Sequence, residues 1–323
     1  METTFRSDHF ALHSLAEGVY AAIASEGGAG FSNAGLIDLG DLTLAFDAFE
    51  NPQAAEDLLK ASIQLTQRKP AVVILSHFHP DHWGGLQVFA DCMILATHAT
   101  RQAMLPTVTE MSRERGNPSK IEDQLRATEA QLEVENDPNR RTILQASITR
   151  QRHRLQALPT LKPTLPSLTF EGKIIFHGVG RQAELISTGK GHTDSDCILR
   201  LPEDRLAFIG DLGFFQAQPF MASSSPPEWI VQLEEMAGWD VQTFVPGHGP
   251  LGSSADLELE ARYIQALEEL VQNVVKQGGA VEDALQQRLP APFDAWQAVG
   301  IRFETNVRSA YARWTRKIGV SRS

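Results

Sequence analysis

The sequence predicts an α/β fold that is interrupted by an inserted helical hairpin and followed by C-terminal helices. Short apolar runs alternate with segments of helical periodicity in the first third of the chain. Helical periodicity without strands takes over near residues 106–162, and again after residue 255. We therefore expect one domain over residues 1–255, interrupted by a hairpin at 106–162. We expect residues 256–323 to form a helical segment that packs on this domain.

The composition of the chain is that of a globular protein with a sizeable core. Of its 323 residues, 42% are hydrophobic and 21% are charged, which is ordinary for a globular domain. The formal net charge of -11 argues against nucleic acid as a partner, because nucleic-acid binders usually present a basic face. Cys92 and Cys197 lack CxxC spacing, so we expect free thiols rather than a disulfide scaffold.

Targeting and membrane signals are not evident in the sequence. The first residues lack a positively charged start followed by an apolar stretch, so no signal peptide is expected. No run approaches the roughly 18 uninterrupted apolar residues of a membrane span. We therefore expect a cytoplasmic enzyme that acts on a small molecule and does not bind membranes.

The N-terminal part is predicted to contain several strands and two helices. The predicted strands cover residues 18–23, 33–38, 42–46, 71–75 and 93–96. Pro52 begins a predicted helix over 52–65, and a second helix is predicted over 82–90. The run 71–75 is continuously apolar, which is typical of a strand buried on both faces.

Residues 117–158 have the pattern of two helices joined by a turn. Apolar residues recur at helical spacing on both sides of a turn signal at 137–139. Their stripe is narrow, like the seam of a coiled coil. Two interpretations remain open. The helices either pack only on each other and on the body, or they form a lid over a site or the contact of a homodimer.

The strand pattern returns after Pro166. Strands are predicted at 168–177, 183–187, 197–201, 205–209 and 243–245. Pro226 begins a predicted amphipathic helix, and helices with one apolar face follow residue 255. A last helix is predicted at about 294–318.

Ligand-type side chains follow the predicted strand at 71–75 at close spacing. They are His77, His79, Asp81 and His82. In a loop, this spacing directs imidazoles and a carboxylate into one small volume. Imidazole nitrogen and carboxylate oxygen suit zinc in catalytic sites that keep an open position. The segment therefore predicts a metal site, and the glycines at 84 and 85 let the backbone pass close to it.

Later segments each place one ligand-type residue beside glycine at the end of a predicted strand. These residues are His192, Asp211 and His248. Together with the first segment they supply five histidines and two aspartates. That set is sufficient for two metal ions that retain positions for water.

These motifs, in this order along the chain, resemble the metallo-β-lactamase superfamily over roughly residues 15–250. The resemblance implies a four-layer αββα sandwich with the metal site at the edge between two sheets. It implies that one zinc ion is bound by His77, His79 and His192. It implies that the second is bound by Asp81, His82 and His248, with Asp211 bridging both. Asp47, near the end of a predicted strand, fits an upstream aspartate that often supports such sites.

The resemblance also implies a reaction. Two divalent cations lower the pKa of a water between them to near neutral, which supplies a hydroxide nucleophile. Asp81 or Asp211 would act catalytically by orienting this nucleophile or by carrying a proton to the leaving group. True β-lactamases of the superfamily generally lack the bridging aspartate. We therefore expect hydrolysis of a small-molecule ester, lactone or thioester, with β-lactamase activity at most secondary.

Other functions remain open from the sequence. The same site serves phosphodiesters and organophosphates, and similar ligand sets hold iron in oxidoreductases of this fold. Iron and manganese also accept the ligands that zinc accepts. A binding protein with a decayed site is the non-enzymatic alternative, which the complete ligand set disfavours. The neighbouring aromatic residues either line an apolar substrate pocket or pack in the core; they are Trp83, Phe214, Phe215 and Phe220.

Overall fold

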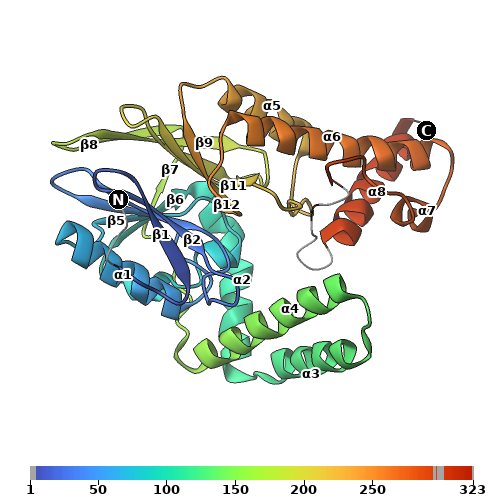
Figure 1. Ribbon diagram of the computed structural model, residues 1–323, viewed down its shortest axis with the longest axis horizontal. Helices are drawn as coiled ribbons and strands as arrows, with labels where there is room; N and C mark the ends of the chain where they lie inside the picture. Colours follow the sequence, from blue (N-terminus) through green and yellow to red (C-terminus); the bar gives the residue numbers. More distant parts are fainter. Residues whose placement is uncertain (1–4, 294–295, 297–301, 322–323) are drawn as a thin grey trace.

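Two β-sheets pack face to face, and helices cover their outer surfaces (Figure 1). The computed structural model describes residues 5–293, 296 and 302–321. The seven-stranded sheet has the order β1-β2-β3-β4-β5-β6-β7, and the five-stranded sheet has the order β12-β11-β10-β9-β8. One hydrophobic cluster lies between the sheets, and others lie beneath the helices on each outer face. The predicted αββα sandwich is confirmed.

The seven-stranded sheet begins with antiparallel strands and continues with parallel ones. The antiparallel part comprises β1 (Phe10–Ala16), β2 (Val19–Ala24), β3 (Ala34–Asp38) and β4 (Thr43–Phe46). The parallel part adds β5 (Val72–Ile74), β6 (Met93–Thr97) and β7 (Leu168–Phe170). The sequence pattern did not indicate β1, whose mixed burial is that of a strand at the sheet edge.

The five-stranded sheet carries the later motifs. Its strands are β8 (Lys173–His177), β9 (Gln182–Gly189), β10 (Asp196–Leu201), β11 (Leu206–Phe214) and β12 (Thr243–His248). The helix α5 (Pro226–Ala237) connects the parallel strands β11 and β12. The hairpin of β10 and β11 turns at the predicted residues 202–204.

The core between the sheets contains a close contact between an aromatic ring and the backbone of the other sheet. Phe208 of β11 is 1% exposed and its ring centroid lies 5.9 Å from that of Phe46 of β4. A Cβ added to Gly35 of β3 would lie 2.3 Å from the Phe208 ring. Because glycine leaves that space free, the large ring can enter the neighbouring sheet.

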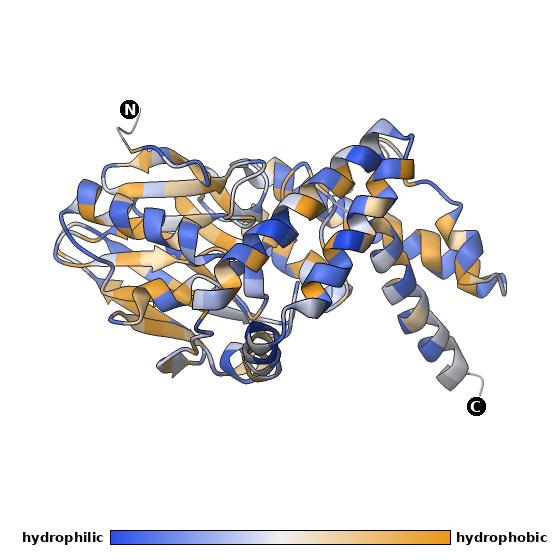
Figure 2. Cartoon of the chain, turned by 90° about the horizontal axis from the view of Figure 1, so that it is seen from below, coloured by the Kyte–Doolittle hydropathy of each residue, from blue (hydrophilic) through white to orange (hydrophobic). Residues whose placement is uncertain are grey.

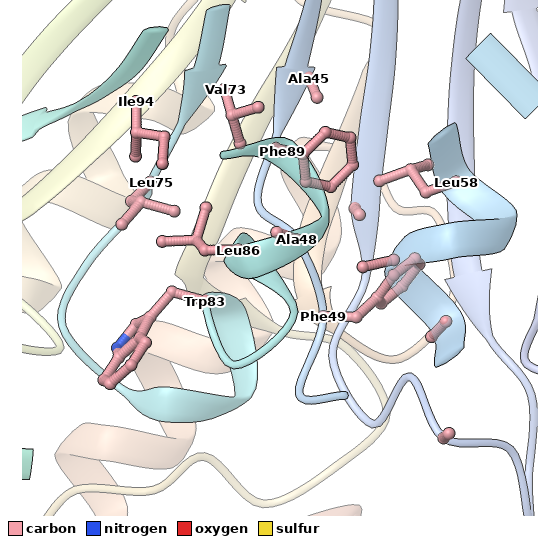
Figure 3. Packing of buried hydrophobic residues seen from close by; sticks show 14 of the residues in the cluster. Ala45, Ala48, Phe49, Leu58, Val73, Leu75, Trp83, Leu86, Phe89 and Ile94 are labelled. Atoms are coloured by element: carbon pink, nitrogen blue, oxygen red, sulfur yellow. The ribbon is translucent and has the colours of Figure 1, made fainter. Parts of the chain in front are cut away.

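The outer face of the first sheet is covered by a cluster that continues into the loop after β5 (Figure 3). Val73 and Ile94 enter this cluster from parallel strands, and Leu58 enters it from α1 (Pro52–Thr66). Trp83 is 1% exposed within the same cluster. The loop that carries the predicted ligands is therefore fixed by core packing on its C-terminal side.

The predicted helix over 82–90 is wrong. The chain instead forms two 3₁₀ turns, η1 (Pro80–His82) and η2 (Leu86–Phe89). A Cβ at Gly84 would lie 2.0 Å from the carbonyl oxygen of Glu50, and one at Gly85 would lie 2.3 Å from that of Ala48. The backbone is held against the β4–α1 loop at these glycines, and this contact prevents a continuous helix.

The single strand predicted at 168–177 is also wrong. Gly172 has φ +73, a conformation that breaks the extended chain. β7 before it belongs to the first sheet, and β8 after it belongs to the second. This short segment is therefore the crossing from one sheet to the other.

The insertion contains the two predicted helices and one more. α3 (Ser119–Val134) and α4 (Pro138–Ala157) form the predicted hairpin, which stands apart from the sheets in Figure 1. α2 (His98–Gly116) precedes them. The sequence did not indicate α2, because its few buried side chains are mixed polar and apolar and Pro106 lies inside it.

The C-terminal helices pack on one another and on α5, which lies over the outer face of the second sheet (Figure 1). α6 (Ser254–Lys276), α7 (Val281–Leu285) and α8 (Arg302–Ser321) share a hydrophobic cluster with α5. Along the described part of α8, the helix that leads to the C label in Figure 2, hydrophobic residues alternate with hydrophilic ones. Part of the helix predicted at 294–318, namely 294–295 and 297–301, lies outside the described residues. Over the described part of the chain, no helix is long and apolar enough to cross a membrane.

Replacing Phe208 with alanine tests the contact between the sheets. Removing a buried aromatic ring leaves a cavity, so we expect the free energy of unfolding to fall by about 3–5 kcal/mol. Urea unfolding measures this change. Val231→Ala on α5 is the control, because Val231 is 59% exposed, and its effect should stay within about 0.5 kcal/mol. If Phe208→Ala lowers the free energy of unfolding no more than the control does, the ring does not stabilise the contact between the sheets.

Candidate metal centre

The ligand-type residues come from the ends of strands in both sheets. The loop after β5 carries the cluster from His77 to His82, and His192 lies in the turn between β9 and β10. Asp211 lies within β11, and His248 ends β12. The amide of Cys197 in β10 donates to the carbonyl of Ser76 at 2.9 Å. This bond joins the two sheets beside the cluster, so residues distant in sequence converge.

The first group of ligand-type atoms lies around one oxygen of Asp211. It contains His77, His79, His192 and Asp211. The Nδ1 atom of His79 lies 3.0 Å from Nε2 of His77 and 2.9 Å from Nε2 of His192. Oδ2 of Asp211 lies 3.3 Å from Nε2 of His192 and 3.6 Å from Nε2 of His77.

The second group lies around the other oxygen of Asp211. Asp81, His82 and His248 also form a set that could hold a metal ion. Oδ1 of Asp211 lies 3.0 Å from Nε2 of His82 and 3.4 Å from Nε2 of His248. Oδ2 of Asp81 lies 3.2 Å from Nε2 of His248. The two carboxylate oxygens of Asp211 are thus divided between the two groups.

Asp47 orients histidines of both groups from behind. Its Oδ2 lies 2.7 Å from Nδ1 of His82 and accepts a hydrogen bond from Oγ of Ser76 at 2.8 Å. Oγ of Ser76 lies 2.9 Å from Nδ1 of His77. Because the Ser76 hydroxyl hydrogen is directed to Asp47, Nδ1–H of His77 donates to that hydroxyl. Both imidazoles therefore present an unprotonated Nε2 toward Asp211 when they are neutral, as metal ligation requires.

The electrostatics of the centre follow from burial and from the two carboxylates. Burial lowers the pKa of His77 and of His192 well below the usual range, although Asp211 opposes this shift. Burial also acts against protonation of His82, but Asp211 and Asp47 raise its pKa well above the usual value. Burial would raise the pKa of Asp211, but His82 and His248 hold it well below the usual range.

The centre fits divalent cations better than it fits hydrogen bonds alone. Nε2 of His82 and Oδ1 of Asp211 are buried without a hydrogen-bond partner, although they lie 3.0 Å apart. A buried polar atom without a partner costs free energy. Imidazole nitrogens and carboxylate oxygens are donors that zinc, iron and manganese accept. A cation in the second group would satisfy both atoms.

The aromatic residues near the motifs have different positions. Trp83 and Phe215 are buried in hydrophobic clusters. Phe214 is fully buried, and its ring stacks on the His248 imidazole at 5.0 Å between centroids. Half-buried Phe220 lies 5.6 Å from the His79 ring. Phe220 is therefore the predicted pocket residue that is only half-buried beside a ligand-type histidine, whereas the other three are buried.

Sequence patterns missed several residues near the centre. The ring of Phe31, which has φ 66, lies 5.4 Å from the His248 ring. The guanidinium of Arg150 in α4 lies 3.4 Å above the Phe31 ring and makes hydrogen bonds to both carboxylate oxygens of Glu50. Arg302 of α8 lies 5.1 Å above the Phe214 ring. These residues lie outside every motif, so their spacing in the sequence did not predict that they would lie near the centre.

A cavity of about 500 Å³ lies between the insertion and the loop after β5, which carries His77 to His82 and is called the ligand loop below. Pro80, between two predicted ligands, forms part of its wall. Met111 and Ala127 contribute apolar lining from α2 and α3, and Arg150 contributes from α4. Arg150 therefore borders both the cavity and the aromatic ring that contacts His248.

Comparisons with known proteins agree with this architecture. The family model of the metallo-beta-lactamase superfamily matches residues 27–248. A metallo-beta-lactamase from Pontibacter korlensis has a similar structure, with a TM-score of 0.56 and 16% identity over 79% of this chain and 99% of that chain. The metallo-beta-lactamase FIM-1 from Pseudomonas aeruginosa gives a TM-score of 0.54 and 15% identity, over 79% of this chain and 95% of that chain.

A double mutant of the sec-alkyl sulfatase PisA1 matches more of the chain. Its TM-score is 0.67 at 15% identity, and the match covers 94% of this chain and 50% of the sulfatase chain. A match of that extent must reach into the C-terminal helices. At such identities the solved structures show a shared fold only. No curated protein matches the sequence.

Replacing Asp47 with asparagine tests the support behind the histidines. The amide would place a donor against Nδ1–H of His82, so we expect metal affinity to fall about 10- to 100-fold. Competition with a chelator of known affinity measures the change. Asp57→Asn is the matched control, because Asp57 bonds to Ser7 and Lys60 away from the centre. Equal affinities in the two variants would show that Asp47 does not orient the ligands.

Proposed function

The chain belongs to the metallo-beta-lactamase superfamily, and from this premise we propose that it is a hydrolase that uses two divalent metal ions. We propose zinc as the metal, and an ester, lactone or thioester of a small molecule as the substrate. The observation that carries the proposal is the division of the two Asp211 oxygens between the two ligand groups. A carboxylate in that position is suited to bridging two cations.

Two cations in these groups would lower the pKa of a water molecule and polarise the scissile carbonyl. The chain's own residues have distinct tasks. Asp211, whose side chain is 3% exposed, fixes the spacing of the two groups. Asp81 is more accessible, with a side chain that is 11% exposed, so it is the carboxylate that can carry a proton to a leaving group.

Aromatic rings limit access of bulk water to the centre. Phe214 closes one side of His248, and Phe31 meets the same imidazole edge-on. Phe220 stands beside His79. A substrate with an apolar portion would bury that portion against Phe220 and Phe31, and its exclusion of water would strengthen the polar interactions at the centre.

A sulfate or phosphate ester is the second candidate substrate. The same bimetal site suits tetrahedral oxyanion esters, because two cations can stabilise the attacking and the leaving oxygen. The extent of the match to the sec-alkyl sulfatase favours this candidate over a β-lactam, since the match reaches beyond the segment shared with the β-lactamases. Metal analysis distinguishes both hydrolase candidates from the iron oxidoreductase alternative.

We further propose that the insertion is a lid that selects the non-reacting part of the substrate. The cavity between the insertion and the ligand loop has the size of a small-molecule site. Both arginines in its wall are paired with carboxylates, Arg150 with Glu50 and Arg154 with Glu114. The cavity therefore suits an uncharged, partly apolar group. A homodimer contact through the same helices is the alternative.

Replacing Asp211 with asparagine tests the bridging role. We expect the purified wild type to bind about two zinc ions per chain, and the variant to lose at least one. Its kcat should fall at least about 100-fold, because the amide carries no charge to hold both cations. Elemental analysis and steady-state kinetics measure these effects. Asp194→Asn is the control, because exposed Asp194 lies in the His192 turn but in neither ligand group.

A substrate panel for the same variant pair separates the candidate reactions. The panel contains a lactone, a thioester, a phosphodiester, a sulfate ester and a β-lactam. Hydrolysis of the first two supports the leading proposal, and hydrolysis of the phosphodiester or the sulfate ester alone supports the second candidate. Redox-active iron with thiol-dependent oxygen uptake would overturn both. Full activity and metal content in Asp211→Asn would remove the bridging role.

Replacing Ala127 with tryptophan tests the lid. The indole would fill part of the cavity, so KM for a long-chain ester should rise about 10-fold relative to a short-chain ester. Metal content should not change. Ala146→Trp on the exposed face of α4 is the control for a bulky substitution in the insertion. Deletion of residues 117–158 tests the dimer alternative. If the deletion converts a dimer into a monomer in solution and leaves the substrate preference unchanged, the dimer alternative is correct.

A further inference from the structure

Arg302 is a cation near the metal centre, and within the described part of the chain no carboxylate forms an ion pair with it. It lies in the first turn of α8, where its Nη1 donates to the carbonyl oxygen of Gln218 at 2.8 Å. Among residues 5–293, 296 and 302–321, no aspartate or glutamate forms an ion pair with Arg302. The guanidinium therefore retains donors for another acceptor.

An aromatic ring connects Arg302 to the second ligand group. The guanidinium carbon lies 5.1 Å from the Phe214 centroid. The Phe214 ring also contacts His248, whose ring is stacked on it at 5.0 Å between centroids with an interplanar angle of 14°. Burial lowers the pKa of the Arg302 guanidinium, and the carboxylates of Asp211 and Asp81 oppose this shift. The charge of Arg302 therefore acts on the metal centre.

Arg150 also lies near the His248 imidazole, but unlike Arg302 it is paired with a carboxylate. Glu50 accepts hydrogen bonds from Nε and Nη2 of Arg150 at 2.7–2.9 Å. That pair is internally neutral. Among the described residues, Arg302 is consequently the guanidinium beside the centre that has charge available for a ligand.

Binding of metal cations at the centre would raise the free-energy cost of keeping the Arg302 charge partly buried beside it. Asp47, Asp81 and Asp211 contribute one negative charge each, so two divalent cations would still leave the centre net positive before an anion binds. The carboxylates that favour Arg302 in the metal-free protein would then be neutralised. A partly buried cation without a counter-ion is unfavourable. An anionic ligand would remove that cost.

We propose that Arg302 binds an oxyanion group of the substrate, and that the substrate is therefore an anionic molecule with an apolar portion. The proposal rests on the hydrolase function proposed above. A carboxylate, a phosphate or a sulfate offers the same chemistry, namely oxygen acceptors that match the planar guanidinium. The apolar portion lies toward the rings of Phe31 and Phe220.

Binding to the zinc-loaded protein tests the proposal without any hydrolysis. Calorimetry compares phenylacetate, benzylphosphonate and benzylsulfonate, whose C–P and C–S bonds are not hydrolysed, with neutral phenylacetamide. In Arg302→Gln, we expect the Kd of at least one oxyanion to rise about 10-fold or more, and that of phenylacetamide to stay unchanged. The oxyanion most affected identifies the group. Arg302→Lys keeps the positive charge and should recover part of the affinity.

Arg308→Gln is the matched control on the same helix. Arg308 has a 47% exposed side chain and pairs with Glu304, so its loss should leave every Kd unchanged. Equal binding of all three oxyanions to wild type and Arg302→Gln would overturn the proposal. An equal loss for phenylacetamide, with no recovery in Arg302→Lys, would also overturn it in favour of a structural role. Either failure leaves the Asp211→Asn test of hydrolysis unaffected.

Discussion

The carboxylate of Asp47 is the interaction on which the centre depends. It accepts hydrogen bonds from the amide and the hydroxyl of Ser76 and lies against Nδ1 of His82. Asp47 has φ 62, and its own amide donates to Ile74. The end of β4 is thereby tied to the end of β5 through a strained backbone conformation. The hydroxyl of Ser76 extends the same support to His77, so one buried carboxylate sets the imidazole orientation in both ligand groups.

Glycines bring the second sheet close enough to share that centre. A Cβ at Gly210 would lie 2.5 Å from Cβ of Ser76, and one at Gly247 would lie 1.9 Å from Oδ1 of Asp211. Either side chain would displace a residue of the centre. The amide of Asn33 donates to Gly247 at 2.7 Å and fixes this approach from the first sheet. Gly210 and Gly247 are therefore needed because the sheets approach too closely for a side chain at either position, apart from any turn that these glycines form.

The parts of the molecule that local spacing determines are the parts that the sequence predicted. His77, Asp81 and the strand before them lie within a few residues of one another, so their pattern is visible in the chain. The failed predictions depend on distant contacts. Gly85 stops a helix because the carbonyl of Ala48 lies where a side chain would be. Arg302 meets Phe214 only after the C-terminal helices have packed, and no pattern around either residue announces that contact.

The residues visible as local motifs account for the chemistry of the centre, whereas the residues brought in by distant contacts account for the choice of substrate. The motifs determine the ligand groups, whereas Arg302, Phe31 and the insertion determine the charge and shape beside them. The net charge of -11 does not contradict an anionic substrate. At physiological ionic strength, exposed charges are screened over about 8 Å, so remote acidic residues contribute little at the centre. A partly buried guanidinium one ring away from His248 is screened much less. The local cation, and not the overall balance, therefore governs which charge the centre accepts.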